Sequence, residues 1–446
     1  MKKNLIKALM CFVLAGIVSC TKQLETTPTE EIDASVALKT SNDVKAALIG
    51  AYADMGDDDF YGGRVFMEAD LLADVDELTW SGTYQGLTQI NNKSIPVDNG
   101  FITDTWLAGY KTINDANNVL SSIQVVVPTD TMQVTGEALF IRGASYFELV
   151  KMYAKAWNDG DPATNLGVPL VLTPTTSISE ANKVKRNTVA QVYQQVINDL
   201  SEAEAKLPAS NGFYATAGAA AAMLARVYLQ QGDYNNALQA ANRAIQNSRT
   251  TEDNPVQLTG SYAAAFGEKN TSEDIFAIQV TSTAGVQGFN EFYAADQRGE
   301  ITINDAHLGL YDSVDERLNL FYEDAGSVYT GKFNFLYGNV HVIRLAEMLL
   351  IRAETNFRLG TNEGAPPVDD INAIRTRASA PIYNPGELTL DNILEERHLE
   401  LAFEGFTLDD KKRLEQKVGN LPWNAPELIF PIPKREILAN PNLTQN

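Results

Sequence analysis

The stretch DELTWSGTYQGLTQINN combines two aromatic rings with several planar polar side chains. Trp80 and Tyr84 could stack on the apolar C–H face of a sugar ring, while Asp76, Gln85 and Asn91 could form hydrogen bonds with its hydroxyl groups. The pattern therefore indicates a surface suited to a carbohydrate. The structural alternative is a tryptophan that folds onto neighbouring helices.

A second stretch, QGFNEFYAADQRG, has the same mixture of aromatic and polar side chains. Its candidate ligand-binding residues are Asn290, Phe292, Tyr293, Gln297 and Arg298. We expect these residues to form a second candidate site, in a part of the chain rich in turn-forming residues.

An acidic segment, DMGDDDFYGG (54–63), places four aspartates beside Gly62 and Gly63. Clustered carboxylates could hold Ca²⁺, which takes six to eight oxygen ligands. The spacing lacks the EF-hand pattern and a distal bidentate glutamate, so we favour a solvated acidic turn and expect no bound metal or cofactor. The adjacent Arg64 could instead bind a ligand hydroxyl or carboxylate.

Three glutamates, Glu396, Glu400 and Glu404, recur every four residues in EERHLELAFEG. Paired carboxylates perform glycoside hydrolysis, but they must lie on opposite sides of the scissile bond, with one pKa raised by burial. Three carboxylates on one helix face, interleaved with Arg397, are better explained as ion pairs that hold neighbouring helices. We therefore expect no catalytic residues.

Other common sites are absent from the sequence. His307, His341 and His398 are far apart and form no HExxH motif, which disfavours a zinc site. The Gly-rich phosphate-binding motifs and the G-x-S-x-G nucleophile motif are also missing. These absences weaken the enzyme hypothesis without excluding it.

The N-terminus has the features of an export signal. Three lysines among the first seven residues precede the apolar run ALMCFVLAGIV, which is too short to span a bilayer, and Ser19 precedes Cys20. This arrangement resembles a bacterial lipobox, which predicts a signal peptide at 1–19, lipidation of Cys20 and a polar tether at 20–35. The alternative is an ordinary secretory peptide with a chance cysteine.

The charge balance disfavours nucleic acid as a partner. Removing residues 1–19 would take away three lysines and no acidic residue, which changes the formal net charge from −22 to −25. Phosphate binding depends on clustered lysine and arginine. The negative charge is explained by solubility alone.

The rest of the chain shows helical periodicity in blocks. Thr188 is an expected N-cap before VAQVYQQVINDLSEAEAKLP, and ALFIRGASYFELVKMYA carries an apolar stripe at three- and four-residue steps. In ATAGAAAAMLARVYLQQGDYNNALQAANRAI the spacing is that of a tetratricopeptide repeat, with its turn at Gly232 and Asp233. Further helices are predicted to end at Gly360 and Gly405.

These blocks predict a mainly all-α fold built on tetratricopeptide-like helical hairpins. Residues 250–340 mix glycine, polar and aromatic residues with short apolar runs, and residues 54–104 are similar. We expect loops, short strands and short helices there, projecting from the helical scaffold. The predicted organisation is one domain over 36–446 whose loops carry the binding site.

Several segments, in this order, resemble the SusD/RagB family of outer-membrane lipoproteins. They are RGASYFELVKMYA, GVPLVL, RNTVAQVYQQVINDLSEAEAKLP, AAAAMLARVYLQQGDYNNALQAANRAI, VIRLAEMLLIRAET, INAIRTRA, ILEERHLELAFEGF and the closing FPIPKREILANPNLTQN. Each segment alone is weakly specific, but together with the lipobox they cover most of the chain.

The resemblance implies a lipid-anchored protein at the cell surface that binds a nutrient, usually an oligosaccharide. Such a protein acts as a hinged lid over a TonB-dependent, SusC-type outer-membrane transporter and is not an enzyme. The family places part of its binding surface in an early loop segment, which ranks Trp80 and its neighbours first. This chain is shorter than many relatives, in the central region where glycan contacts usually lie.

Two alternatives remain open from the sequence. The ligand could be a peptide, since some relatives handle peptides. The helical repeat could also be a scaffold that binds only protein partners.

Overall fold

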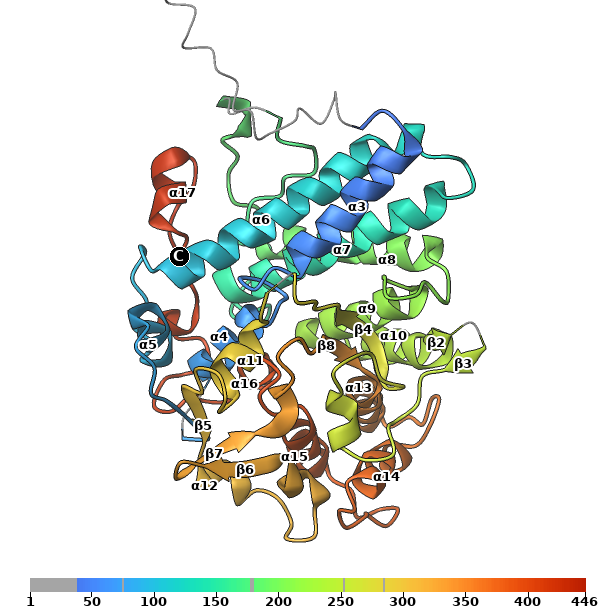
Figure 1. Cartoon of the computed structure of the whole chain (residues 1–446), viewed down its shortest axis with the longest axis vertical. Helices are drawn as coiled ribbons and strands as arrows, with labels where there is room; N and C mark the ends of the chain where they lie inside the picture. The colour runs from blue at the N-terminus through green and yellow to red at the C-terminus, as the bar shows by residue number, and fades with distance from the viewer. Residues whose placement is uncertain (1–37, 74–75, 177–179, 252, 284) are drawn as a thin grey trace, which may run out of the picture.

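The longer helices of the chain pack one against the next in a continuous stack (Figure 1). The structure is a computed structural model that describes residues 38–73, 76–176, 180–251, 253–283 and 285–446. Cys20 and the expected tether lie outside the described residues. The long helices are α3 Ser41–Met55, α6 Gly100–Ser121, α7 Thr131–Tyr153, α8 Val189–Lys206, α9 Ala217–Gln231, α10 Tyr234–Asn247, α13 Leu345–Leu359, α14 Pro367–Arg377 and α15 Leu390–Glu400. The mainly helical fold is as the sequence predicts.

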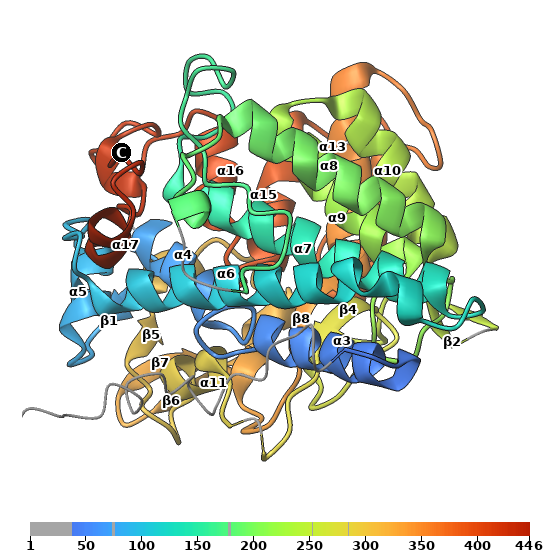
Figure 2. The same ribbon diagram turned by 90° about the horizontal axis from the view of Figure 1, so that it is seen from above.

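Each long helix contacts the next one in the chain through α10, and α10 then packs on α13, which contacts α14 and α15. The helices α3 and α6 run side by side across the width of the molecule (Figure 2). Among the described residues, no helix is both long and apolar enough to cross a bilayer.

Gly143 lies where α7 and α8 approach each other closely. A Cβ atom there would lie 3.0 Å from Cγ of Leu200, so the Leu200 side chain would have to shift to admit it. The helix α8 begins with a full capping box, in which Thr188 accepts from the Gln191 N–H and Gln191 reaches back to the Thr188 N–H.

The hairpin of α9 and α10 forms where the tetratricopeptide spacing predicts it. Thr216 caps the start of α9, and Gly232 ends it with a φ of 71°, in the left-handed region that glycine tolerates. Asp233 then caps α10 through the N–H of Asn236. The alanines of α9 from Ala219 to Ala222 are fully buried, and their small size lets the neighbouring helices approach.

The remaining elements are short and lie mainly at the lower left of Figure 1. Antiparallel pairs join β1 to β5, β2 to β3, β4 to β8 and β6 to β7. The strands are β1 Leu78–Trp80, β2 Arg249–Thr251, β3 Asn254–Pro255, β4 Asp274–Ile278, β5 Ile301–Ile303, β6 Phe321–Asp324, β7 Ser327–Thr330 and β8 Val340–Arg344. The short helices are α4 Arg64–Ala73, α5 Gln85–Asn91, α11 Gly288–Tyr293, α12 Asp305–Leu308, α16 Thr407–Arg413 and α17 Lys434–Ala439.

Two sequence expectations need correction. The segment 54–104 contains the short helix α4, and every residue of it from Val65 to Ala73 is buried, so this helix does not project from the scaffold. The last predicted helix also ends early, at Glu400 instead of Gly405. There the carbonyl of Glu400 accepts hydrogen bonds from Tyr262, Lys332 and Arg344, which take the place of further helical N–H donors.

A buried network of ion pairs joins α15 to its surroundings, as the glutamate spacing predicts. Arg344 contacts Glu273 at 2.7 Å, Glu400 at 2.9 Å and Glu404 at 2.8 Å. Arg377 contacts Glu273 at 2.7 Å and Glu400 at 2.6 Å. Further pairs connect Arg317 to Asp315 and Glu396, Arg375 to Glu396, and Lys332 to Glu404.

The network keeps the Glu400 carboxylate charged. Burial alone would raise the pKa of Glu400, but the guanidinium groups of Arg377, Arg344 and Arg317 outweigh burial and lower it to about 2. A lowered carboxyl pKa stabilises the folded state above the unfolded pKa, and this contribution is lost as the pH falls toward 2.

Removing one central cation tests this network. We expect Arg344→Met to lower the free energy of unfolding by roughly 3–5 kcal/mol, because Glu273, Glu400 and Glu404 each lose one of the cations that compensate their burial. The matched control is Arg243→Met, which breaks the more exposed pair of Arg243 with Glu204 and should cost at most about 1 kcal/mol. Urea titration of both variants measures the difference, and equal losses would contradict the role of the network.

The helix α4 carries two buried carboxyl groups that lack a cationic partner at hydrogen-bonding distance in the described structure. Burial raises the pKa of Asp70 to about 8, although the Tyr293 hydroxyl and the Gly405 N–H lie within 3.1 Å and 3.0 Å of its oxygens. Burial likewise raises the pKa of Glu68 to about 8. Both groups are therefore largely protonated at neutral pH in the folded protein.

A raised carboxyl pKa stabilises the fold at low pH and loses that contribution as the pH rises through the folded pKa. As the pH rises from the unfolded pKa of Asp70 to its folded pKa, this group should therefore lower the free energy of unfolding by about 1.4 kcal/mol per pH unit. We expect Asp70→Asn to lack this slope. Its free energy of unfolding, compared with that of wild type, should therefore increase as the pH rises from 5 to about 8. Denaturant titrations across this range measure it. The exposed Asp98→Asn is the control, and a constant difference between wild type and Asp70→Asn would refute the assignment.

Candidate functional site

The two stretches predicted to bind ligand lie side by side in the structure. The strand β1 pairs with β5, with Trp80 opposite Ile301. The first stretch continues from β1 into α5, and the second forms α11 and the turn that leads into β5. One short sheet therefore brings two distant parts of the chain to the same place.

Rings and guanidinium groups from both stretches, together with two further residues, form a cluster that we term the aromatic–arginine cluster. It is defined as Trp80, Tyr84, Phe292 and Arg298 from the stretches, and Arg64 and Phe101. The Tyr84 ring lies 5.4 Å from Phe101 and 6.1 Å from Phe292 between centroids. Trp80 lies 5.9 Å from Phe292. The Arg298 guanidinium carbon is 4.3 Å from the Tyr84 centroid, a cation–π distance.

The two aromatic residues that the sequence ranked first differ in how much of the side chain is exposed to solvent. Tyr84 is 40% exposed. Trp80 is half-buried, and its indole N–H donates to the Thr88 hydroxyl at 2.9 Å. A Cβ atom at Gly82 would lie 2.2 Å from the Trp80 ring, so the ring rests on bare backbone. Trp80 therefore braces the surface, and Tyr84 presents it to solvent.

Charged groups flank the cluster on both sides. Arg298 pairs with Glu300 at 2.6 Å. Arg64 pairs with Asp58 at 2.6 Å and also with Asp59, and its guanidinium carbon is 5.1 Å from the Phe101 centroid. Burial raises the pKa of Asp58 to about 6, although Arg64 opposes this shift. The acidic turn is thus partly buried and paired with Arg64, instead of being fully solvated.

The other polar candidates of the first stretch have varied surroundings. Asp76 and Gln85 are exposed, and Asn91 is half-buried. The Asp76 backbone is held by the Asn304 side chain, whose Nδ2 donates to the Asp76 carbonyl at 2.9 Å. From the second stretch, Gln297 is exposed.

Asn290, Phe292 and Tyr293 are buried, unlike the surface positions that the sequence suggested. Asn290 donates through Nδ2 to the Phe333 carbonyl at 2.7 Å, and Tyr293 is hydrogen-bonded to Asp70. Phe292 is 1% exposed. The reason is local, because α11 turns these side chains inward against α4. They support the surface from below and do not face solvent in this structure.

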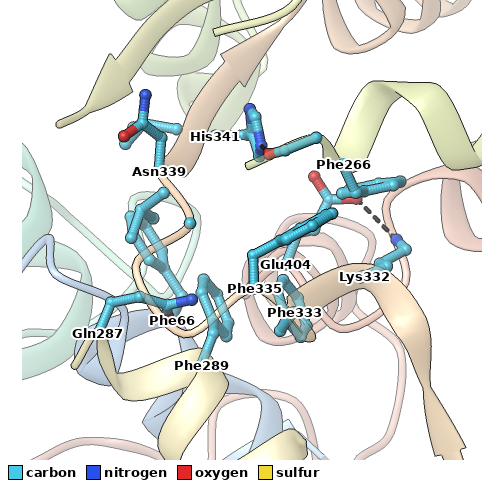
Figure 3. A pocket seen from close by; sticks show the side chains of 14 residues that line it. Phe66, Phe266, Gln287, Phe289, Lys332, Phe333, Phe335, Asn339, His341 and Glu404 are labelled. Carbon is cyan, nitrogen blue, oxygen red and sulfur yellow. Dashed lines mark hydrogen bonds and ion pairs between the residues drawn. The ribbon is translucent and has the colours of Figure 1, made fainter. Parts of the chain in front are cut away.

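A small hollow is lined in part by Phe66, Phe289, Phe333 and Phe335 (Figure 3). The rings of Phe289 and Phe333 stack at 4.2 Å. The cavity volume is only about 20 Å³, enough for a water molecule and far too small for a sugar ring.

Two larger grooves escaped the sequence analysis. One, of about 380 Å³, is lined by the exposed pair Phe213 and Tyr214 together with Arg249, Asn270 and Asp274. The aromatic pair in NGFYATAG was the available signal. The other groove, of about 430 Å³, is lined in part by Glu77 and His398.

Comparisons with known proteins place the chain among similar sequences and structures. A family model described as starch-binding associating with the outer membrane matches residues 24–229, and a SusD family model matches residues 329–428. SusD-like protein P2 of Formosa agariphila is 25% identical, with 97% of each chain covered.

Solved structures of similar fold match nearly the whole length of this chain. A SusD superfamily protein from Bacteroides thetaiotaomicron is 26% identical with a TM-score of 0.79, covering 91% of this chain and 99% of that one. A laminarin-binding SusD-like protein is 23% identical with a TM-score of 0.75, covering 92% and 99% respectively. The chain belongs to the SusD/RagB family.

Proposed function

We propose that the aromatic–arginine cluster is a glycan-binding surface. The observation that carries this proposal is the exposed Tyr84 ring, which is held in place by Phe101, Phe292 and Arg298. An aromatic ring fixed at the surface offers a flat apolar face, and polar groups around it can bind sugar hydroxyls. The family, and a relative described as laminarin-binding, support a carbohydrate ligand.

The polar partners of the sugar would come from the rim of the cluster. Arg298 is partly exposed and has five N–H donors in a planar fork, of which Glu300 uses two. Gln85 is exposed at the first turn of α5, immediately after Tyr84. Stacking on one ring with a few hydrogen bonds gives weak binding, which suits a protein that must release its ligand.

The same proposal includes the membrane role. The lipobox-like sequence before Cys20 supports a lipid anchor on the outer membrane, and the family-model description points to association with that membrane. We propose that the protein lies at the cell surface as the lid of a SusC-type, TonB-dependent transporter. It captures ligand without catalysis, and its helical stack would contact the transporter.

Tyr84→Ala tests the glycan surface. Calorimetry against a panel of β-glucans and α-glucans first identifies a glycan that the wild type binds. We expect Tyr84→Ala to bind this glycan roughly tenfold more weakly, or worse, because truncating a hot-spot aromatic residue costs above about 1.4 kcal/mol. Arg298→Met should weaken binding in the same direction.

The control for that experiment is Phe213→Ala, which removes another exposed aromatic residue from the groove of about 380 Å³. It should bind like wild type. Loss of binding in Phe213→Ala alone would move the site to that groove. Binding of short peptides with every glycan silent would overturn the ligand class.

Cys20→Ser tests the anchor and the partner together. We expect the variant to leave the membrane fraction, because a polypeptide without acyl chains has no apolar anchor. Gentle detergent extraction of the wild type should bring down a large outer-membrane barrel. Unchanged membrane attachment of Cys20→Ser would overturn the lipid anchor, and a wild type that extracts alone would overturn the lid role.

A further inference from the structure

Two of the three histidines converge on one carboxylate at the start of β1. Nδ1 of His307, in α12, lies 2.7 Å from Oε2 of Glu77. Nε2 of His398, in α15, lies 2.7 Å from the same oxygen and 3.0 Å from Oε1. One potential ligand atom from each residue lies within 4.8 Å of the others. The histidines are far apart in the sequence, which disfavoured a zinc site, but the fold brings two of them together.

The Tyr311 hydroxyl contacts the second ring nitrogen of His307. It lies 3.1 Å from the Leu399 carbonyl oxygen and 3.0 Å from Nε2 of His307. In the tautomer that donates from Nε2 to Tyr311, Nδ1 of His307 keeps its lone pair and can ligate an ion beside Glu77.

Burial differs among the three side chains. His307 is fully buried, whereas Glu77 and His398 are half-buried. The site therefore has one potential ligand held in the core and two that reach solvent.

We propose that Glu77, His307 and His398 bind a divalent transition-metal ion, with Zn²⁺ as the reference ion. Imidazole ligands favour zinc, copper, iron and nickel over Ca²⁺ and Mg²⁺, which take oxygen ligands. Tyr311 would then orient His307 through its second ring nitrogen, as outer partners of metal-bound histidines commonly do.

The site geometry accommodates such an ion after a small adjustment. Zinc ligands at about 2.0–2.1 Å in tetrahedral geometry lie roughly 3.3 Å apart, so the 2.7 Å contacts must open by about 0.6 Å. The side chains of Glu77 and His398 are 26% and 28% exposed and line the groove of about 430 Å³. An ion can enter from this groove, and water from it can supply the fourth ligand.

The metal would attach the candidate glycan surface to the helical core. Glu77 immediately precedes β1, the strand that ends at Trp80, whereas His398 belongs to α15. A bond through the ion would fix the start of β1 to the stack. The metal site does not depend on the proposed glycan binding, and either can fail alone.

Zinc uptake by the purified full-length protein tests the proposal. After chelation and dialysis, the wild type should take up one equivalent of Zn²⁺, measured by elemental analysis at equilibrium, and zinc should raise its melting temperature. The near-isosteric Glu77→Gln and the variant His398→Ala should lose that equivalent. Tyr311→Phe should retain it with an affinity lowered roughly 10- to 100-fold.

The matched control is His341→Ala. His341 also pairs with a carboxylate, Asp274, at 2.7 Å, but it has no second histidine beside it. It should take up one zinc ion like wild type. If the wild type retains no more zinc than the double variant Glu77→Gln/His398→Ala, with both folded by circular dichroism, the site is a hydrogen-bonded triad and the proposal is wrong.

Discussion

Arg344 makes buried contacts with Glu273, Glu400 and Glu404, and these contacts hold together elements that are far apart in the sequence. Arg344 is the N-cap residue of α13 and the last residue of β8, while Glu400 ends α15. A guanidinium group with three carboxylates at 2.7–2.9 Å fixes the relative position of the elements that carry them. Desolvation makes such networks costly to assemble, and a misplaced partner would leave a buried charge unpaired.

The short strands and loops take their positions from this anchored part of the molecule. The network includes Arg317 and Lys332, which lie on either side of the β6–β7 hairpin. The strand β7 packs beside β5, which pairs with β1. In this way a chain of contacts runs from the ion pairs of the helical core to Trp80 and Tyr84. The surface can therefore be irregular in sequence and still be held in one geometry.

How much the sequence could predict depends on the range of the interactions involved. Local signals succeeded: Thr188 and Gly232 mark helix ends through bonds to nearby residues, and the spacing of Glu396 and Glu400 predicted the ion pairs. The burial of α4 was not predicted, because it depends on tertiary contacts that surround the helix. The meeting of Tyr84 with Arg298, and of Glu77 with two histidines 230 and 321 residues away, depends on tertiary contacts that one sequence does not reveal.

The same physics explains why the candidate surface is preformed. Tyr84 already contacts Phe101, Phe292 and Arg298, and the Trp80 indole N–H already has its acceptor in Thr88. The entropy of ordering these side chains is lost when the protein folds, so a ligand does not have to order them again. Phe292 contributes without touching solvent, because a buried ring beneath Tyr84 prevents the exposed ring from collapsing inward. In the proposed site, Phe292 would therefore influence binding only by supporting Tyr84, the residue proposed to contact the ligand.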